Sequence, residues 1–281
     1  MRTESRKMSV ILVAVFALLL GLTVTLRAAD VYQENFDAGW VNDTATGRLD
    51  EKGTFPETWA FRLHGAGMWL MVDAPEPQKK VLQFKGESFN NGWWSGGGQH
   101  GVVCPAGKTI QLDGWIREAT PAKNVDIAYL WLSTPEQNGY GLVVIRSNAY
   151  EHSNDLNDNK NYVTVFKYRD NPVKFGENPT CEWKTQDGDR PKAPVAVETA
   201  NDGYLHFFLQ LKQKAAGAPV EISLFYKDTK NPPVMTWTDD GAQFGPVIDV
   251  ANLTYVGVTA ENGKDYPHAI QYDAIGVALL P

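Results

Sequence analysis

The stretch TIQLDGWIRE, from Thr109 to Glu118, decides the fold class of this chain. Apolar residues at Ile110, Leu112 and Ile116 alternate with polar or amphipathic ones. Successive side chains of a β-strand point to opposite faces of a sheet, so this alternation predicts a strand with one buried face.

Similar segments recur along the chain, and no window beyond the first 29 residues has a sustained helical period. Clusters of Gly, Pro, Asn and Asp, which supply turn geometries, separate them. Many short strands with turn signals and little helix predict an all-β, two-sheet antiparallel sandwich of the jelly-roll type. The other predicted strands are residues 31–36, 68–72, 81–85, 100–104, 126–133, 141–147, 162–168, 205–211, 220–226, 234–237, 253–259 and 269–279.

The longest irregular stretch runs from Asp170 to Gly203. A loop of this length inside a compact domain is usually functional or locally disordered. We expect a binding loop here rather than a linker, because strands on both sides are needed to complete the sheets. Trp183, which lies in this stretch, is a candidate ligand-binding residue.

The first 29 residues have the pattern of an export signal. A basic start at Arg2, Arg6 and Lys7 precedes an apolar run, and small residues follow at Ala28 and Ala29. The alternative is an uncleaved membrane anchor, because the apolar run approaches the ~20 residues that cross a bilayer. We expect cleavage, a single β-sandwich domain over residues 30–281, no membrane insertion of the mature chain, and a secreted, periplasmic or cell-surface location.

Cleavage after residue 29 leaves 22 basic and 32 acidic residues, so the net charge falls from −7 to −10. A nucleic-acid binder needs a basic surface to displace counterions from phosphate, and none is visible. We therefore predict no nucleic-acid partner. Long-range repulsion of polyanions favours a neutral ligand or one bound through a cation.

Cys104 and Cys181 are the two cysteines of the chain. Export favours an oxidising compartment, so a Cys104–Cys181 disulfide is one interpretation. Two separate buried thiols are the other. The sequence leaves both open.

Three short motifs resemble the concanavalin A-like lectin/glucanase superfamily, which includes LamG-like jelly rolls. They are Glu34-Asn35-Phe36-Asp37, Leu112-Asp113-Gly114-Trp115-Ile116-Arg117 and Tyr272-Asp273-Ala274-Ile275-Gly276-Val277. The resemblance spans most of residues 31–280 and implies that the first and last strands lie side by side. It supports the fold more than any function, because one fold hosts many activities.

Carboxylates near both ends of the mature chain form a candidate metal site. If the first and last strands are neighbours, Glu34 or Asp37 can meet Asp273, and carboxylate and carbonyl oxygens suit Ca²⁺. The superfamily resemblance implies a structural calcium there, with Asp273 as a ligand. The alternative is an exposed pair of carboxylates at the strand ends.

The segment NNGWWSGGGQH, residues 90–100, is the strongest candidate ligand site. Alternation along a strand makes it hard to bury both Trp93 and Trp94, and an exposed indole can stack on the C–H face of a pyranose. Asn91 and Gln99 can donate to and accept from sugar hydroxyls. The alternative is that these tryptophans fill the space between the sheets.

Catalytic signatures are missing from the sequence. It contains no H-E-x-x-H, no G-x-S-x-G and no E-x-D-x-x-E pair of the superfamily's glucanases. We therefore predict no catalytic residues and a non-catalytic, lectin-like protein that binds a glycan or polysaccharide. The alternatives are a glycoside hydrolase or polysaccharide lyase on the same fold, and a structural or adhesive surface protein.

Overall fold

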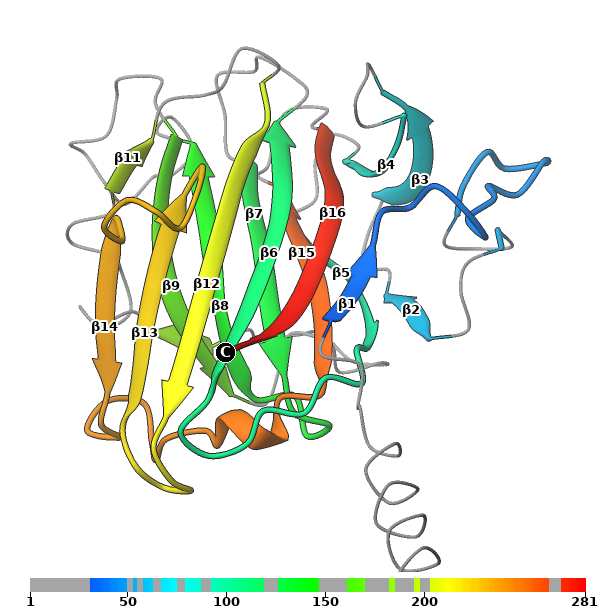
Figure 1. Ribbon diagram of the computed structural model, residues 1–281. Coiled ribbons are helices and arrows are strands. Elements are labelled where there is room, and N and C mark those ends of the chain that lie inside the picture. Colours follow the sequence, from blue (N-terminus) through cyan, green and yellow to red (C-terminus); the bar gives the residue numbers. More distant parts are fainter. Residues whose placement is uncertain are drawn as a thin grey trace, which may run out of the picture.

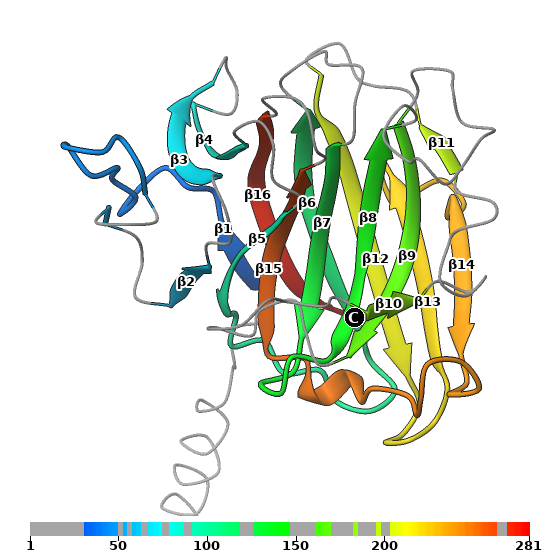
Figure 2. The same cartoon turned by 180° about the vertical axis from the view of Figure 1, so that it is seen from behind.

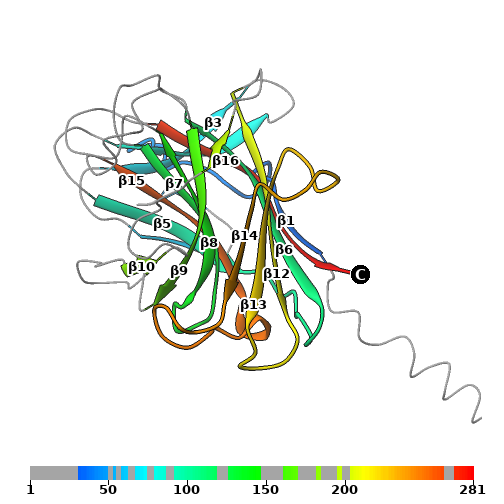
Figure 3. The same cartoon turned by 90° about the vertical axis from the view of Figure 1, so that its left-hand side faces the viewer.

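The computed structural model is a sandwich of two antiparallel β-sheets, as predicted (Figures 1 and 3). The structure describes residues 31–49, 53–54, 58–62, 67–74, 79–86, 92–118, 126–146, 161–169, 182–184, 195–197, 203–262 and 269–281. The predicted export signal therefore lies outside the described residues. Within those residues, no helix combines the length and apolar character that crossing a bilayer requires.

One sheet, called sheet I, contains both ends of the described chain. Its order is β14-β13-β12-β6-β16-β4-β3, and β1 pairs with β16 beside this path. Its strands are β1 (Val31–Glu34), β3 (Met68–Asp73), β4 (Lys80–Lys85), β6 (Thr109–Glu118), β12 (Leu205–Gln213), β13 (Val220–Tyr226), β14 (Met235–Asp239) and β16 (Ala269–Leu280).

The other sheet, called sheet II, has the order β10-β9-β8-β7-β15-β5-β2, and β11 also pairs with β9 (Figure 2). Its strands are β2 (Trp59–Arg62), β5 (Gly92–Gln99), β7 (Asp126–Ser133), β8 (Gly139–Arg146), β9 (Asn161–Arg169), β10 (Glu182–Lys184), β11 (Val195–Val197) and β15 (Tyr255–Asn262). A short 3₁₀ turn, η2 (Val250–Asn252), precedes β15.

Strand alternation builds the core between the sheets. In β6, Ile110, Leu112 and Ile116 are fully buried, and the residues between them are half-buried on the outer face. Removing such apolar surface from water stabilises the fold by roughly 25 cal/mol per Å². The stretch Thr109–Glu118 therefore forms a strand with one buried face, as its alternation predicts.

The pairing of β1 with β16 confirms the expected neighbourhood of the first and last strands, with Glu34 opposite Ile275. A β-bulge between Asp273 and Gly276 interrupts the ladder from β16 to β6. An extra residue at a bulge redirects the strand and its side chains. Asp273 thus lies where the last strand bends.

The strand predicted over residues 100–104 is wrong. The strand is β5, Gly92–Gln99, and the chain from His100 to Cys104 is irregular, with Gly101 at φ +68°. A run of glycines predicts a turn by local chemistry. Here the glycines are strand residues, and a side chain on them would meet the rings of Phe61 and Trp131 or the backbone of Thr58.

The interval from Asp170 to Gly203 is not wholly irregular, because β10 and β11 lie within it and pair with β9. Cys104, by contrast, lies on the irregular segment after β5. It is buried and carries a free thiol in the structure, and burial raises the pKa of that thiol. Cys181 lies outside the described residues, so the disulfide stays a prediction.

Candidate functional site

A pocket of about 250 Å³ opens on sheet II, and we call it the Trp131 pocket. Its lining comes from β2, β5, β15 and β7, which run side by side in sheet II (Figure 2), and from the turn after β7. Its lining residues are Thr58, Trp59, Ala60, Gly97, Gly98, Trp131, Ser133, Thr134, Pro135, Gln137 and Tyr255.

The ring of Trp131 lies close to the backbone because β15, which pairs with β7, and β5, the next strand along, present glycine beneath it. A Cβ on Gly257 would come within 2.3 Å of the Trp131 ring, and one on Gly97 within 2.7 Å. Any other residue at these positions would clash, since a glycine is required where a ring approaches the backbone this closely. The glycine run of β5 therefore makes room for the indole ring of Trp131.

Hydrogen bonds fix the direction of the indole. Trp131 Nε1 donates to Thr259 Oγ1 over 3.0 Å, and Thr259 Oγ1 lies 2.7 Å from Ser95 Oγ. Trp131, Thr259 and Ser95 are all at least 97% buried. A buried indole N–H needs such a partner, so the ring is held in one orientation.

An aromatic layer continues from Trp131 across the outer face of sheet II. Tyr168 meets Trp131 edge to face at 6.3 Å, and its hydroxyl donates to the backbone oxygen of Leu132. Phe166 lies 5.6 Å from Tyr168 and 5.5 Å from Tyr129. Such contacts rigidify the base of the pocket, because aromatic pairs stabilise beyond their buried area.

The rim of the pocket is polar but uncharged. Gln99 Nε2 donates to the hydroxyl of Tyr255 over 2.8 Å, which fixes the half-buried ring of Tyr255. On the opposite side, Gln137 lies in the turn between β7 and β8, and its Oε1 accepts no hydrogen bond from the described residues. None of the described lining residues carries a charge. Rings beside hydroxyls and amides are the chemistry that a neutral polyhydroxylated ligand requires.

The structure brings part of the predicted ligand site to this pocket. Gln99 does not line the pocket but donates a hydrogen bond to the lining residue Tyr255, and Trp93 and Trp94 lie on β5, opposite Glu261 and Ala260 of β15. Asn91 lies outside the described residues. Trp183 lies on β10, opposite Tyr168 of β9. The ligand-binding roles of these residues stay predictions.

Trp59, Trp131 and Tyr255, the aromatic residues of the pocket lining, were not singled out from the sequence. The signal was present in β7, where inward Ala128, Leu130 and Leu132 alternate with Tyr129 and Trp131. A strand that is apolar on both faces is covered on both faces. That pattern indicates an occupied outer face, although it cannot show which strands supply the partners.

The predicted metal residues converge near the bulge of β16. Burial raises the pKa of Asp273 to about 7, the N–H of Ala274 opposes this rise, and the charges of Asp37 and Glu34 add to it. Burial also raises the pKa of Glu34, whose Oε1 accepts from Phe36 N at 2.7 Å and Trp40 Nε1 at 3.1 Å.

These carboxylates are close enough to interact, but the described residues contain no group of three His, Cys, Asp or Glu side chains that could hold a metal ion. The remaining ligands of a calcium ion would have to be backbone carbonyl oxygens. The calcium site stays a prediction.

Comparison with known proteins gives structural neighbours only. No protein-family model matches the chain, and no curated protein matches it in sequence. A protein of unknown function from Shewanella oneidensis MR-1 is 10% identical, with 93% of this chain and 92% of that chain covered and a TM-score of 0.46.

Two further neighbours are the Emp47p carbohydrate recognition domain and the Crh5 transglycosylase. The first is 12% identical, covers 89% of this chain and 95% of its own, and has a TM-score of 0.40. The second is 10% identical, covers 89% and 85%, and has a TM-score of 0.43. At these values the likeness carries no argument about function.

Proposed function

We propose that this chain is an exported, non-catalytic carbohydrate-binding protein whose ligand occupies the Trp131 pocket. One observation carries the proposal: the described lining combines three aromatic residues with hydroxyls and one amide and includes no charged side chain. Pyranose rings have apolar C–H faces bordered by hydroxyls, so they match such a lining.

Trp131 and Tyr255, two of the three aromatic lining residues, have different parts in this proposal. Trp131 is only 3% exposed, so it forms the base of the pocket. Tyr255 is half-buried at the rim, where its ring can contact a ligand and its hydroxyl is already oriented by Gln99. Tyr255 is therefore the residue whose removal affects binding with the least damage to the fold.

Binding of the folded, processed protein to a panel of soluble and insoluble polysaccharides tests the proposal, with calorimetry for any soluble ligand found. We expect Tyr255→Ala to weaken binding about tenfold or more, because buried aromatic contacts typically contribute over ~1 kcal/mol. Phe225→Ala is the matched control, since Phe225 is also half-buried but lies on β13 of the other sheet. It should bind like the wild type.

Three outcomes would contradict parts of the proposal. A folded protein that binds no glycan of the panel contradicts carbohydrate binding and favours a structural or adhesive role. Release of reducing ends from a bound polysaccharide contradicts the non-catalytic part. A mature N-terminus that still begins at Met1 contradicts cleavage of the export signal.

A further inference from the structure

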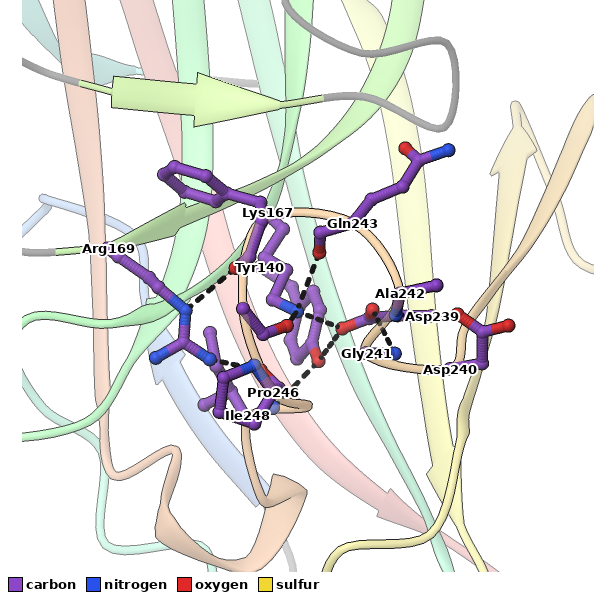
Figure 4. Close-up of polar contacts among 12 residues, drawn as sticks. Tyr140, Lys167, Arg169, Asp239, Asp240, Gly241, Ala242, Gln243, Pro246 and Ile248 are labelled. Carbon is purple, nitrogen blue, oxygen red and sulfur yellow. Dashed lines mark hydrogen bonds and ion pairs between the residues drawn. The ribbon is translucent and has the colours of Figure 1, made fainter.

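Lys167 and Asp239 meet inside the sandwich, at the junction of the two sheets (Figure 4). Lys167 belongs to β9 of sheet II, and Asp239 ends β14 of sheet I. Lys167 Nζ lies 2.7 Å from Asp239 Oδ2, and the two side chains are 0% and 1% exposed. An amine and a carboxyl group are thus held in contact away from water.

Backbone groups of the loop after β14 hold the lysine nitrogen in place. Nζ donates to the carbonyl oxygens of Gly245 at 2.9 Å and Gln243 at 3.4 Å. Arg169, next but one on β9, donates to the carbonyl oxygens of Phe244 and Pro246 in the same loop. The nitrogen therefore cannot swing away from Asp239 without breaking several hydrogen bonds.

The surroundings of Asp239 contain the donors that acyl substitution requires. The N–H of Gly241 donates to Oδ1 over 3.1 Å, and the hydroxyl of Tyr140 donates to Oδ2 over 2.6 Å. The Tyr140 oxygen itself accepts from Ile248 N at 3.0 Å. One carboxyl oxygen thus faces a fixed N–H and the other faces a proton donor, as in sites that stabilise tetrahedral intermediates.

Burial favours the uncharged form of Lys167. Desolvation is the main influence on Lys167 and lowers the pKa of its ammonium, while the partner Asp239 raises it. Transfer of one proton across the contact converts the ion pair into an amine and a carboxylic acid with no change in net charge. Removing charge from a dry interior makes this form accessible, because buried ions carry a large desolvation cost.

We propose that Lys167 and Asp239 are joined by an intramolecular amide bond between Nζ and Cγ. Nζ, as the free amine, attacks Cγ of the protonated carboxyl, and the negative charge that develops on Oδ1 is stabilised by the Gly241 N–H. Tyr140 gives its proton to Oδ2 and recovers one from the nitrogen. Oδ2 leaves as water, the carbonyl re-forms, and no oxidant or other reactant is consumed.

The amide keeps two of the neighbouring hydrogen bonds and gives up those from Tyr140 to Oδ2 and from Nζ to Gln243. Its single N–H can still donate to Gly245, and its oxygen still accepts from Gly241. The buried charges disappear, and a covalent link joins β9 of sheet II to β14 of sheet I. The bond would keep Lys167 and Asp239 linked even in the unfolded chain.

The intact mass of the denatured, processed protein tests the proposal once its N-terminus is known. We expect a mass lower than that of the linear sequence by one water molecule. Trypsin should then yield a branched peptide that contains both residues, because it does not cut after an acylated lysine. A full linear mass together with a free tryptic peptide spanning residues 161–167 overturns the proposal and leaves an ordinary ion pair.

Two variants separate the covalent bond from a merely structural contact. Asp239→Asn should reach the same final mass as the linked wild type, because an asparagine loses ammonia where an aspartate loses water. Lys167→Arg keeps a cation beside Asp239 but should show the full linear mass. If Lys167→Arg fails to fold, Tyr140→Phe is the alternative, and it should leave a measurable unlinked fraction; complete linking in it contradicts the assigned acid.

Discussion

Two aspartates of this molecule are buried to nearly the same degree in opposite electrical surroundings. Asp239 is 1% exposed and contacts Lys167, whereas Asp273 is 5% exposed and has Glu34 and Asp37 as its charged neighbours. The first carboxyl gains a partner from the other sheet, and the second has a pKa raised to about 7. Burial alone thus does not determine what a buried carboxyl contributes, because the sign of its neighbours decides it.

Removing Asp239 should have the largest effect on stability. Asp239→Ala leaves the nitrogen of Lys167 buried without its acidic partner, and removing one member of a buried pair typically costs about 3–5 kcal/mol. Chemical denaturation at neutral pH measures this loss. The double variant Lys167→Met with Asp239→Leu should be more stable than Asp239→Ala, and the reverse order would show that the cluster does not behave as a pair.

Asp273→Asn should stabilise the folded protein at pH 8, whereas Asp239→Ala should destabilise it. The folded protein binds a proton at Asp273 up to about pH 7, whereas an unfolded aspartate releases it near pH 4. Wild-type stability therefore falls as the pH rises from about 4 to about 7. The asparagine variant lacks this loss, so at pH 8 we expect it to be more stable by about 1–3 kcal/mol without calcium.

The response of Tm to calcium is a second way to distinguish Asp273 from Asp239. If the predicted site is real, Ca²⁺ at pH 8 should raise the wild-type Tm, and EGTA should reverse the rise. Asp273→Asn should not respond, and Asp239→Asn should respond like the wild type. A Tm unchanged by either addition removes the calcium prediction but leaves the pH dependence in place.

His100 extends the comparison to a buried base. It should affect folding stability only at acidic pH. Burial lowers the pKa of His100 to about 4, and its Nδ1 accepts from Val102 N over 3.1 Å. An unfolded histidine takes up its proton near pH 6.5, so stability falls as the pH falls from about 6.5 to 4.

At pH 5 the loss from His100 amounts to about 2 kcal/mol, at roughly 1.4 kcal/mol for each pH unit. His100→Asn keeps an acceptor for Val102 and should flatten the slope of thermal melts between pH 6.5 and 5. An equal slope in both proteins would assign the acid sensitivity to other groups.

Most of the fold could be predicted from the sequence because its signals are local. The alternation in Thr109–Glu118 reports a buried face directly. The position of the first strand beside the last was implied by the superfamily resemblance, and the pairing of β1 with β16 confirms it. The prediction at the glycines of β5 was wrong because the reason for a glycine there lies in contacts with distant residues. A glycine that opens a turn and one that makes room for Trp131 are identical in sequence.

The site was less predictable for the same reason. The sequence singled out Gln99 as a candidate, and its ligand-binding role stays a prediction; its hydrogen-bond partner Tyr255 comes from a strand far along the chain. Lys167 and Asp239 belong to different sheets, and no spacing rule relates them. Contacts between sheets depend on how the layers stack, which periodicity within one strand does not encode.

The glycines under Trp131 also limit which substitutions can change the shape of the pocket. Because Trp131 lies so close to backbone, a side chain added at Gly97 or Gly257 would displace the ring instead of reshaping the cavity. Under the proposed function, altered ligand preference should therefore arise at Gln137 or Tyr255, with both glycines kept. Laboratory selection for altered recognition should concentrate its libraries on those two lining positions.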